Sequence, residues 1–86
     1  MENAISFKSL KVGQKGEVKK TISEEDVKLF ADLSLDTNPL HMDEGFASKT
    51  RFKGRIVHGM LVSSLISAAV GTKMPGPGSV WMDQSL

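Results

Sequence analysis

Residues 56–71, IVHGMLVSSLISAAVG, contain no Lys, Arg, Asp or Glu. Apolar or small side chains fall on every side of this segment, which predicts a helix ended by Gly71. A helix without a charged face is normally enclosed by protein, so a sheet has to wrap it. The rest of the chain offers two strand candidates, residues 13–23 and 79–86. We therefore expect residues 1–86 to be one domain that continues beyond residue 86, with partner chains as the other possible source of sheet.

Length and charge exclude several classes of function. A chain of 86 residues buries only about 60–65% of its unfolded surface, so its own core is small. Eleven Lys and Arg against ten Asp and Glu leave a net charge of +1, which gives no electrostatic case for nucleic acid or an anionic membrane. With no cysteine there are no disulfides, thiolate metal sites or cysteine nucleophile, and we expect a cytoplasmic protein with no signal peptide or membrane span.

Two short helices are predicted before the apolar segment. The first covers residues 23–34, with Ser23 as N-cap and Asp26 completing a capping box. It has to end before Pro39, because proline moves the preceding residue out of the helical region and lacks an N–H. A second helix is expected to begin at Asp43, which can cap it, and to run through Phe46 and Ala47. A basic loop follows at residues 49–55, and we expect it to be solvated.

Between these helices, Asp36 and His41 lie on either side of Asn38-Pro39 in the stretch LDTNPLHMDEGF, residues 35–46. One interpretation makes Asp36 a turn residue that bonds backbone N–H groups, with His41 a partly exposed loop residue. The other makes them an acid–base pair that shares one water, on a backbone stiffened by Pro39. Spacing alone leaves both interpretations open.

The start of the apolar helix offers a second candidate element. The first N–H groups of a helix have no internal partners, and Gly59 would let a substrate oxygen approach them without a Cβ in the way. Tight packing of the helix is the alternative role of Gly59. His58 is interpreted as a buried, hydrogen-bonded histidine rather than a second base. Ser67, like serines 63 and 64, is interpreted from the residues alone as a packing residue.

Together these stretches resemble the MaoC-like hot-dog proteins, in particular the (R)-specific enoyl-CoA hydratases. The resemblance covers residues 12–86 and lies in a D-x-N-P-[LI]-H core met by residues 36–41, in GRIVHGML at 54–61 and in the PGPG turn at 75–78. It implies an α+β hot-dog fold, an antiparallel sheet wrapped around a central helix, of which this chain is the N-terminal portion. Many relatives have Gly where this chain has Leu35.

The resemblance also implies an activity and a set of residues. Asp36 would be the principal base and His41 its partner in activating a water that adds to a trans-2-enoyl-CoA, giving the (R)-3-hydroxyacyl-CoA. The N–H of Gly59 would hold the thioester carbonyl oxygen, Ser67 would belong to the active site, and Asn38 and Pro39 would form the supporting turn. No metal or redox cofactor is implied. The partners would be an acyl-CoA substrate and a second copy of the chain in a homodimer.

Three other functions remain compatible with the same residues. One is a dehydratase acting on 3-hydroxyacyl thioesters of acyl carrier protein, and another is a non-catalytic acyl-CoA-binding hot-dog subunit. The third is a hot-dog thioesterase, whose water would have to attack the carbonyl carbon. The presence of both Asp36 and His41 argues against the non-catalytic subunit, and the motif matches thioesterases less well. The sequence does not indicate the acyl chain length.

Overall fold

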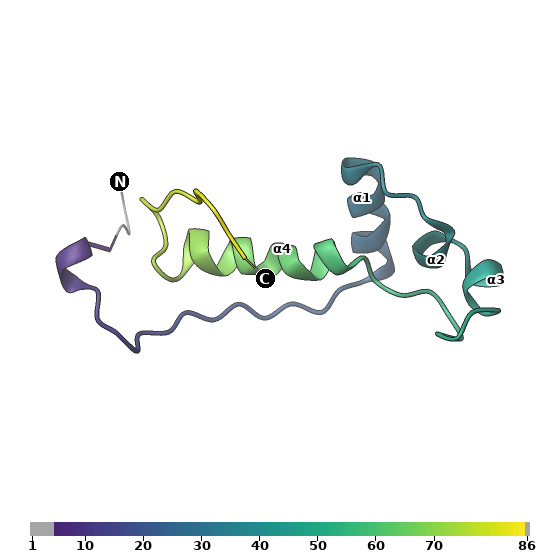
Figure 1. Ribbon diagram of the computed structural model, residues 1–86, viewed down its shortest axis with the longest axis horizontal. Coiled ribbons are helices and arrows are strands. Elements are labelled where there is room, and N and C mark those ends of the chain that lie inside the picture. Colours follow the sequence, from purple (N-terminus) through teal and green to yellow (C-terminus); the bar gives the residue numbers. More distant parts are fainter. Residues whose placement is uncertain (1–4, 86) are drawn as a thin grey trace. The chain divides into compact units, whose positions relative to one another are not determined.

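The computed structural model describes residues 5–85, and its elements are all helical. In chain order they are the short 3₁₀ helix η1 (Phe7–Ser9) and the α-helices α1 (Glu24–Ser34), α2 (Pro39–Met42), α3 (Glu44–Ala47) and α4 (Gly59–Thr72) (Figure 1). The chain divides into two compact units, one within Met1–Lys19 and Ser64–Leu86 and the other Lys20–Ser63. The candidate site falls in the second unit, and each unit is described by itself.

Helix α1 begins and ends as local chemistry dictates. The Ser23 side chain accepts the N–H of Asp26 (3.1 Å), and the Asp26 carboxylate accepts the N–H of Ser23 (3.0 Å), so the predicted capping box is confirmed. The helix ends at Leu35, which adopts a left-handed conformation with φ of 68°. Glycine is the residue that takes this conformation without strain, so a leucine here is costly.

Helices α2 and α3 are single turns that follow the predicted bend. The Asn38 side chain caps α2 by accepting the N–H of Leu40 (3.0 Å), and Pro39 takes the first helical position, where its missing N–H does no harm. Asp43 caps α3 through the N–H of Phe46 (3.0 Å), as predicted. Helix α2 packs against α1 and α3. No helix was predicted between residue 34 and Asp43, so α2 was missed by the sequence analysis.

The core of the second unit is small. Its buried residues are Val27 and Ala31 on α1, Ala47 on α3, and His58 just before α4. Arg55 holds the loop before α4 from outside, with its guanidinium 2.8 Å from Glu24 and 3.5 Å from Glu44. The basic loop is therefore tied through Arg55 to both α1 and α3, although it was expected to be simply solvated.

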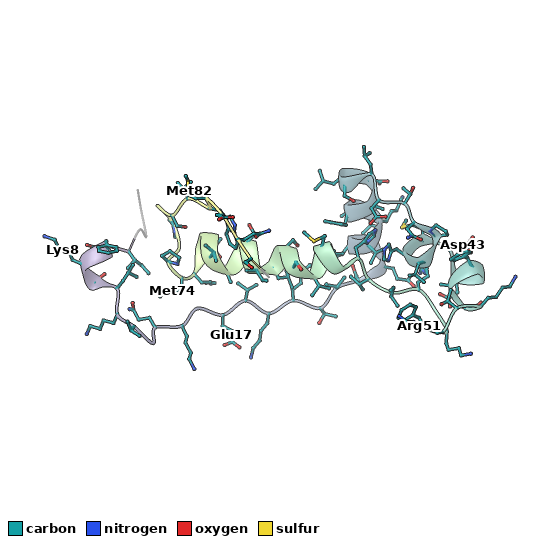
Figure 2. The ribbon with its side chains drawn as sticks, viewed as in Figure 1. Lys8, Glu17, Asp43, Arg51, Met74 and Met82 are labelled. Carbon is teal, nitrogen blue, oxygen red and sulfur yellow. The ribbon has the colours of Figure 1, made fainter. Side chains whose placement is uncertain are left out.

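The two predicted strands are not formed within residues 5–85. Residues 13–23 carry no strand structure, and Glu17, labelled in Figure 2, forms an ion pair with the exposed Lys19 (3.4 Å). Residues 79–85 also carry no strand, and residue 86 lies outside the described range. A strand requires ladder hydrogen bonds to a second strand, which a favourable residue pattern does not supply.

Helix α4 differs from its prediction in two ways. It continues through Gly71 to Thr72, so the predicted end at Gly71 was wrong. None of its residues is buried, and Met60 is 61% exposed and Val62 50% exposed, whereas an enclosed helix was expected. The apolar sequence indicates that the helix is suited to burial, but burial also needs another element to cover it. The described part of the chain forms no sheet that could do so.

Candidate active site

Asp36 is held by hydrogen bonds on both sides of its backbone and at its side chain. Its N–H donates to the Ser34 hydroxyl (3.2 Å), and its carboxylate accepts the N–H of Asn38 (3.2 Å). Its carbonyl oxygen accepts a hydrogen bond from His58 Nε2 (2.9 Å). The turn role considered for Asp36 is therefore present. It does not exclude the acid–base role, because a carboxylate can accept several hydrogen bonds.

His41 lies on α2, half-buried, with one ring nitrogen engaged. Its Nδ1 is 2.8 Å from the carbonyl oxygen of Ile56, fifteen positions along the chain. A carbonyl oxygen only accepts, so in the neutral ring this bond assigns the hydrogen to Nδ1 and the lone pair to Nε2. This contact leaves Nε2 as the nitrogen that can take up a proton.

His58 is the most buried large side chain near the site, with 1% of its surface exposed. Its ring stacks on His41, with the ring centres 3.9 Å apart and the planes inclined by 31°, and it packs edge-to-face with Phe30, with the ring centres 5.0 Å apart. This burial agrees with the interpretation from sequence, but only one of the two ring nitrogens has a hydrogen-bond partner among the described residues. Its Nδ1 has no hydrogen-bond partner among the described residues, a deficit that costs about 1–3 kcal/mol in buried sites.

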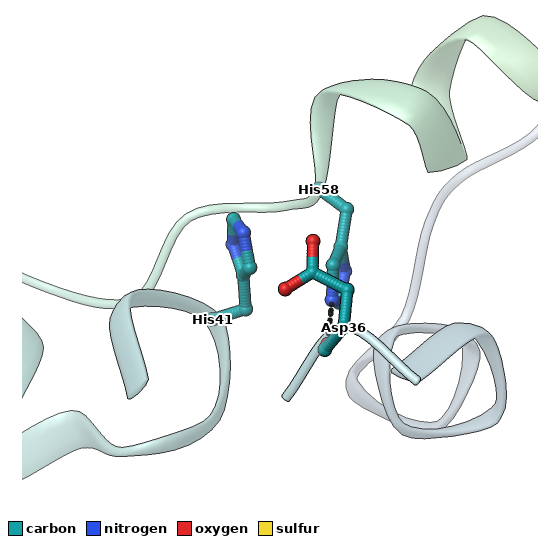
Figure 3. A group of neighbouring side chains, drawn as sticks. All are labelled: Asp36, His41 and His58. Carbon is teal, nitrogen blue, oxygen red and sulfur yellow. Dashed lines mark hydrogen bonds between the residues drawn. The ribbon is translucent and has the colours of Figure 1, made fainter. Parts of the chain in front are cut away.

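The three side chains form one cluster. One potential ligand atom each from Asp36, His41 and His58 lies within 4.8 Å of the others, and Figure 3 shows the Asp36 carboxylate beside the two rings. The sequence analysis brought Asp36 and His41 together but gave His58 no part in the site. A signal was available, because His58 directly precedes Gly59 in the GRIVHGML motif.

The stacked rings make this cluster a poor metal site. Two imidazoles that share one tetrahedral zinc ion at about 2.0–2.1 Å have ring centres about 5 Å apart. The ring centres here are only 3.9 Å apart, with the planes inclined by 31°, so the rings lie closer together than two imidazoles that share one ion. The arrangement suits the relay of a proton between a carboxylate and an imidazole better than the binding of a cation.

Gly59 is the first residue of α4 and is exposed. A Cβ built on it meets nothing within 4 Å, so tight packing does not account for the glycine in this structure. The first N–H groups of a helix point outward with the positive end of its dipole, which suits a negatively charged oxygen. Ser67 is exposed on α4 but belongs to the other unit, so its part in the site stays a prediction.

Known proteins resemble this chain in sequence and structure. Residues 7–83 match the family described as MaoC like domain. An (R)-specific enoyl-CoA hydratase from Rhodospirillum rubrum is 54% identical over 80 residues, which cover 93% of this chain and 56% of that protein. A mitochondrial 3-hydroxyacyl-[acyl-carrier-protein] dehydratase from Arabidopsis thaliana is 44% identical over 77 residues, covering 90% of this chain and 45% of that protein.

A solved structure of an (R)-hydratase also resembles this chain. An (R)-hydratase from A. caviae involved in PHA biosynthesis superposes with a TM-score of 0.86 at 49% identity, covering 90% of this chain and 58% of that one. This likeness supports the hot-dog fold, although no sheet is formed within residues 5–85. The chain spans about half the length of the curated relatives it matches. Since the family match extends over residues 7–83, the chain belongs to the MaoC-like domain family.

Proposed function

We propose that this chain carries the catalytic residues for (R)-specific hydration of trans-2-enoyl-CoA to (R)-3-hydroxyacyl-CoA. The observation that carries the proposal is the meeting of the Asp36 carboxylate and the His41 imidazole within 4.8 Å. General acid–base catalysis requires that both groups reach the same reacting atom and that the backbone holds them in fixed positions. The similarity to (R)-specific hydratases supports the same assignment.

In the proposed reaction, one water lies between Asp36 and His41. Its oxygen bonds to C3 of the enoyl group while one of its protons leaves to the Asp36 carboxylate. C2 takes up a proton through the Asp36–His41 pair, so that the sum is one water added across the double bond. The bond from His41 Nδ1 to the Ile56 carbonyl supports this role, because it uses Nδ1 as the donor and so assigns the lone pair of the neutral ring to Nε2.

Addition of water moves negative charge onto the thioester carbonyl oxygen. The N–H at Gly59, the first residue of α4, is the proposed donor to that oxygen, and the open space around Gly59 supports its access. Loss of one such donor typically costs on the order of 3 kcal/mol in transition-state stabilisation. The proposal requires no metal or redox cofactor, since carboxylate, imidazole and N–H supply all of the polar steps.

The second candidate is the same chemistry on a different carrier. The Arabidopsis thaliana relative is a 3-hydroxyacyl-[acyl-carrier-protein] dehydratase, and removal of water uses the same base and the same oxyanion donor in reverse. Homodimer formation, a sheet around α4 and a cytoplasmic location complete the proposal. They derive from the resemblance and the composition. No helix among residues 5–85 has the length and apolarity to cross a membrane.

The test is a direct assay of the purified chain. Crotonyl-CoA and crotonyl-[acyl-carrier-protein] are supplied separately, loss of the conjugated thioester is followed by absorbance, and the product is resolved by chiral chromatography. We expect (R)-3-hydroxybutyryl-CoA as the main product. A product of (S) configuration, or no turnover of either thioester by a chain whose far-ultraviolet circular dichroism is helical, would contradict the proposal. A preference for the carrier protein would favour the second candidate.

A further inference from the structure

His58 is the buried group near the site that the proposed mechanism does not use. It is 1% exposed, and its two ring nitrogens have different environments. Nε2 lies 2.9 Å from the carbonyl oxygen of Asp36, while Nδ1 is buried without a partner among the residues described. A phenyl ring of similar size could fill the same space without a stranded polar atom. The hydrogen bond made by Nε2 is therefore the reason to have an imidazole at this position.

We propose that His58 is a positioning residue that holds the base, its imidazole partner and the oxyanion donor in one geometry. The inference rests on the proposed function, because it assigns His58 a purpose in that reaction. His58 touches Asp36 by a hydrogen bond and His41 by ring stacking, and it joins Gly59 by a peptide bond. One side chain and its own backbone therefore connect all three proposed reacting groups.

The bond to Asp36 acts on the orientation of the carboxylate. Asp36 directly follows the left-handed Leu35, outside any helix, so no helical hydrogen bond fixes its carbonyl group. The Nε2–H of His58 supplies that constraint from a position 22 residues further along the chain. Together with the bonds to Ser34 and Asn38, it fixes the peptide units on both sides of the Asp36 Cα, and so the direction of its side chain.

The stacking contact acts on His41. An imidazole tied only through Nδ1 to the Ile56 carbonyl could still turn about that bond. The His58 ring, 3.9 Å away and inclined by 31°, blocks this turn on one face. The edge contact of Phe30 at 5.0 Å in turn supports His58 from α1. Nε2 of His41 is thereby kept in a fixed direction, as a proton-transfer group requires.

The two contacts can be separated by two substitutions. His58→Phe keeps a ring against His41 but removes the donor to Asp36, whereas His58→Gln keeps an N–H donor of similar reach but removes the ring. Removal of a group that orients a reacting residue typically costs about 10- to 100-fold. We expect kcat of His58→Phe to fall by about that factor with KM changed less than about threefold, and His58→Gln to recover part of the loss.

A spectroscopic readout tests the geometry without any substrate. The chain has two histidines, so nitrogen-15 spectra of the rings contain two sets of signals, and His58→Phe assigns both. In the unsubstituted chain we expect His41 to carry its hydrogen on Nδ1 and His58 on Nε2. We also expect the amide signals of Asp36 and its neighbour Thr37 to shift in His58→Phe more than in His58→Gln.

Each outcome decides one of the two proposals. His58 with its hydrogen on Nδ1, or unchanged kcat in both variants, overturns the positioning role while the hydratase assignment stands. An unsubstituted chain that hydrates no enoyl thioester refutes the proposed function, and the nitrogen-15 spectra then still decide whether His58 holds Asp36. If circular dichroism shows that His58→Phe is unfolded, two other measurements decide the inference. They are the ring spectra of the unsubstituted chain, and the kcat of His58→Gln, which we expect to be lower than that of the unsubstituted chain.

Discussion

Asp36→Asn separates the two roles that the structure gives to one side chain. The amide oxygen of asparagine can accept the N–H of Asn38, as the carboxylate does at 3.2 Å, and the bonds at the Asp36 N–H and carbonyl belong to the backbone. All of these hydrogen bonds survive the substitution, so the stability of this exposed position should change by no more than about 0.5 kcal/mol. The base is lost, and general base catalysis contributes about 10²- to 10⁴-fold, or about 3–5 kcal/mol in activation free energy.

The assay compares kcat for crotonyl-CoA hydration with the helical signal at 222 nm in the same preparation. Asp32→Asn is the matched control, because it removes an exposed carboxylate from α1, four residues before Asp36. We expect the control to keep its rate and Asp36→Asn to lose at least about 100-fold in kcat at unchanged helicity. If Asp36→Asn turns over within about threefold of the unsubstituted chain, Asp36 is a turn residue and the base has to be sought elsewhere.

Three further predictions use the same chain. Leu35→Gly should stabilise the second unit by about 0.5–1 kcal/mol in urea unfolding, since glycine takes φ of 68° without strain, and a loss of stability would contradict this. The hydrogen bond from the Ser23 N–H, and to a smaller extent the contact with Lys20, lowers the pKa of Asp26 below 3.8. The stabilisation of α1 by the Asp26 carboxylate is therefore present above that value and is lost as pH falls through the lowered pKa. Helicity measured during acid titration should therefore drop less in Asp26→Asn. Gly59→Ala should leave helicity unchanged or higher, since the added Cβ meets nothing within 4 Å. If a substrate oxygen approaches the N–H at residue 59, the same substitution should lower kcat/KM by about 10- to 100-fold. An unchanged kcat/KM would show that Gly59 does not belong to the site.

Predictions from sequence succeeded where the determining contacts are local. The capping box of α1 joins residues three positions apart, and Asp43 caps α3 over the same separation. Pro39 acts through its own covalent geometry, which any backbone has to respect. The bend between Asp36 and His41, which brings the two side chains together, was accessible for this reason.

The prediction was wrong where the outcome depends on distant partners. The apolar pattern of residues 56–71 correctly indicated a helix, but no pattern within α4 states whether another element covers it, and in the described structure Met60 and Val62 remain exposed. The same reason applies to residues 13–23, where strand-forming side chains have no second strand beside them. Burial and hydrogen bonding of His58 were predicted correctly, but its partner was not identified, because the carbonyl of Asp36 lies 22 positions away.

The candidate site is built almost entirely from contacts inside Lys20–Ser63. Asp36, His41, His58 and Gly59 all fall within that unit, and the bonds that hold them come from Ser34, Asn38 and Ile56 in the same range. Strand pairing is therefore not what orients the reacting groups; short loops, caps and one buried imidazole do so. If the proposed function holds, these residues accelerate hydration and dehydration of one thioester equally, because a catalyst does not change the direction of a reaction.

We propose that residues outside this unit select the carrier and the length of the acyl chain. A hydratase for CoA thioesters and a dehydratase for acyl carrier protein can share the Asp36–His41 pair, the Gly59 donor and the His58 contacts without any difference in those residues. Substitutions within the unit should then change the rates with both carriers by the same factor and leave their ratio constant. A substitution at Asp36, His41 or His58 that altered the carrier preference would contradict this division between the chemistry and its specificity.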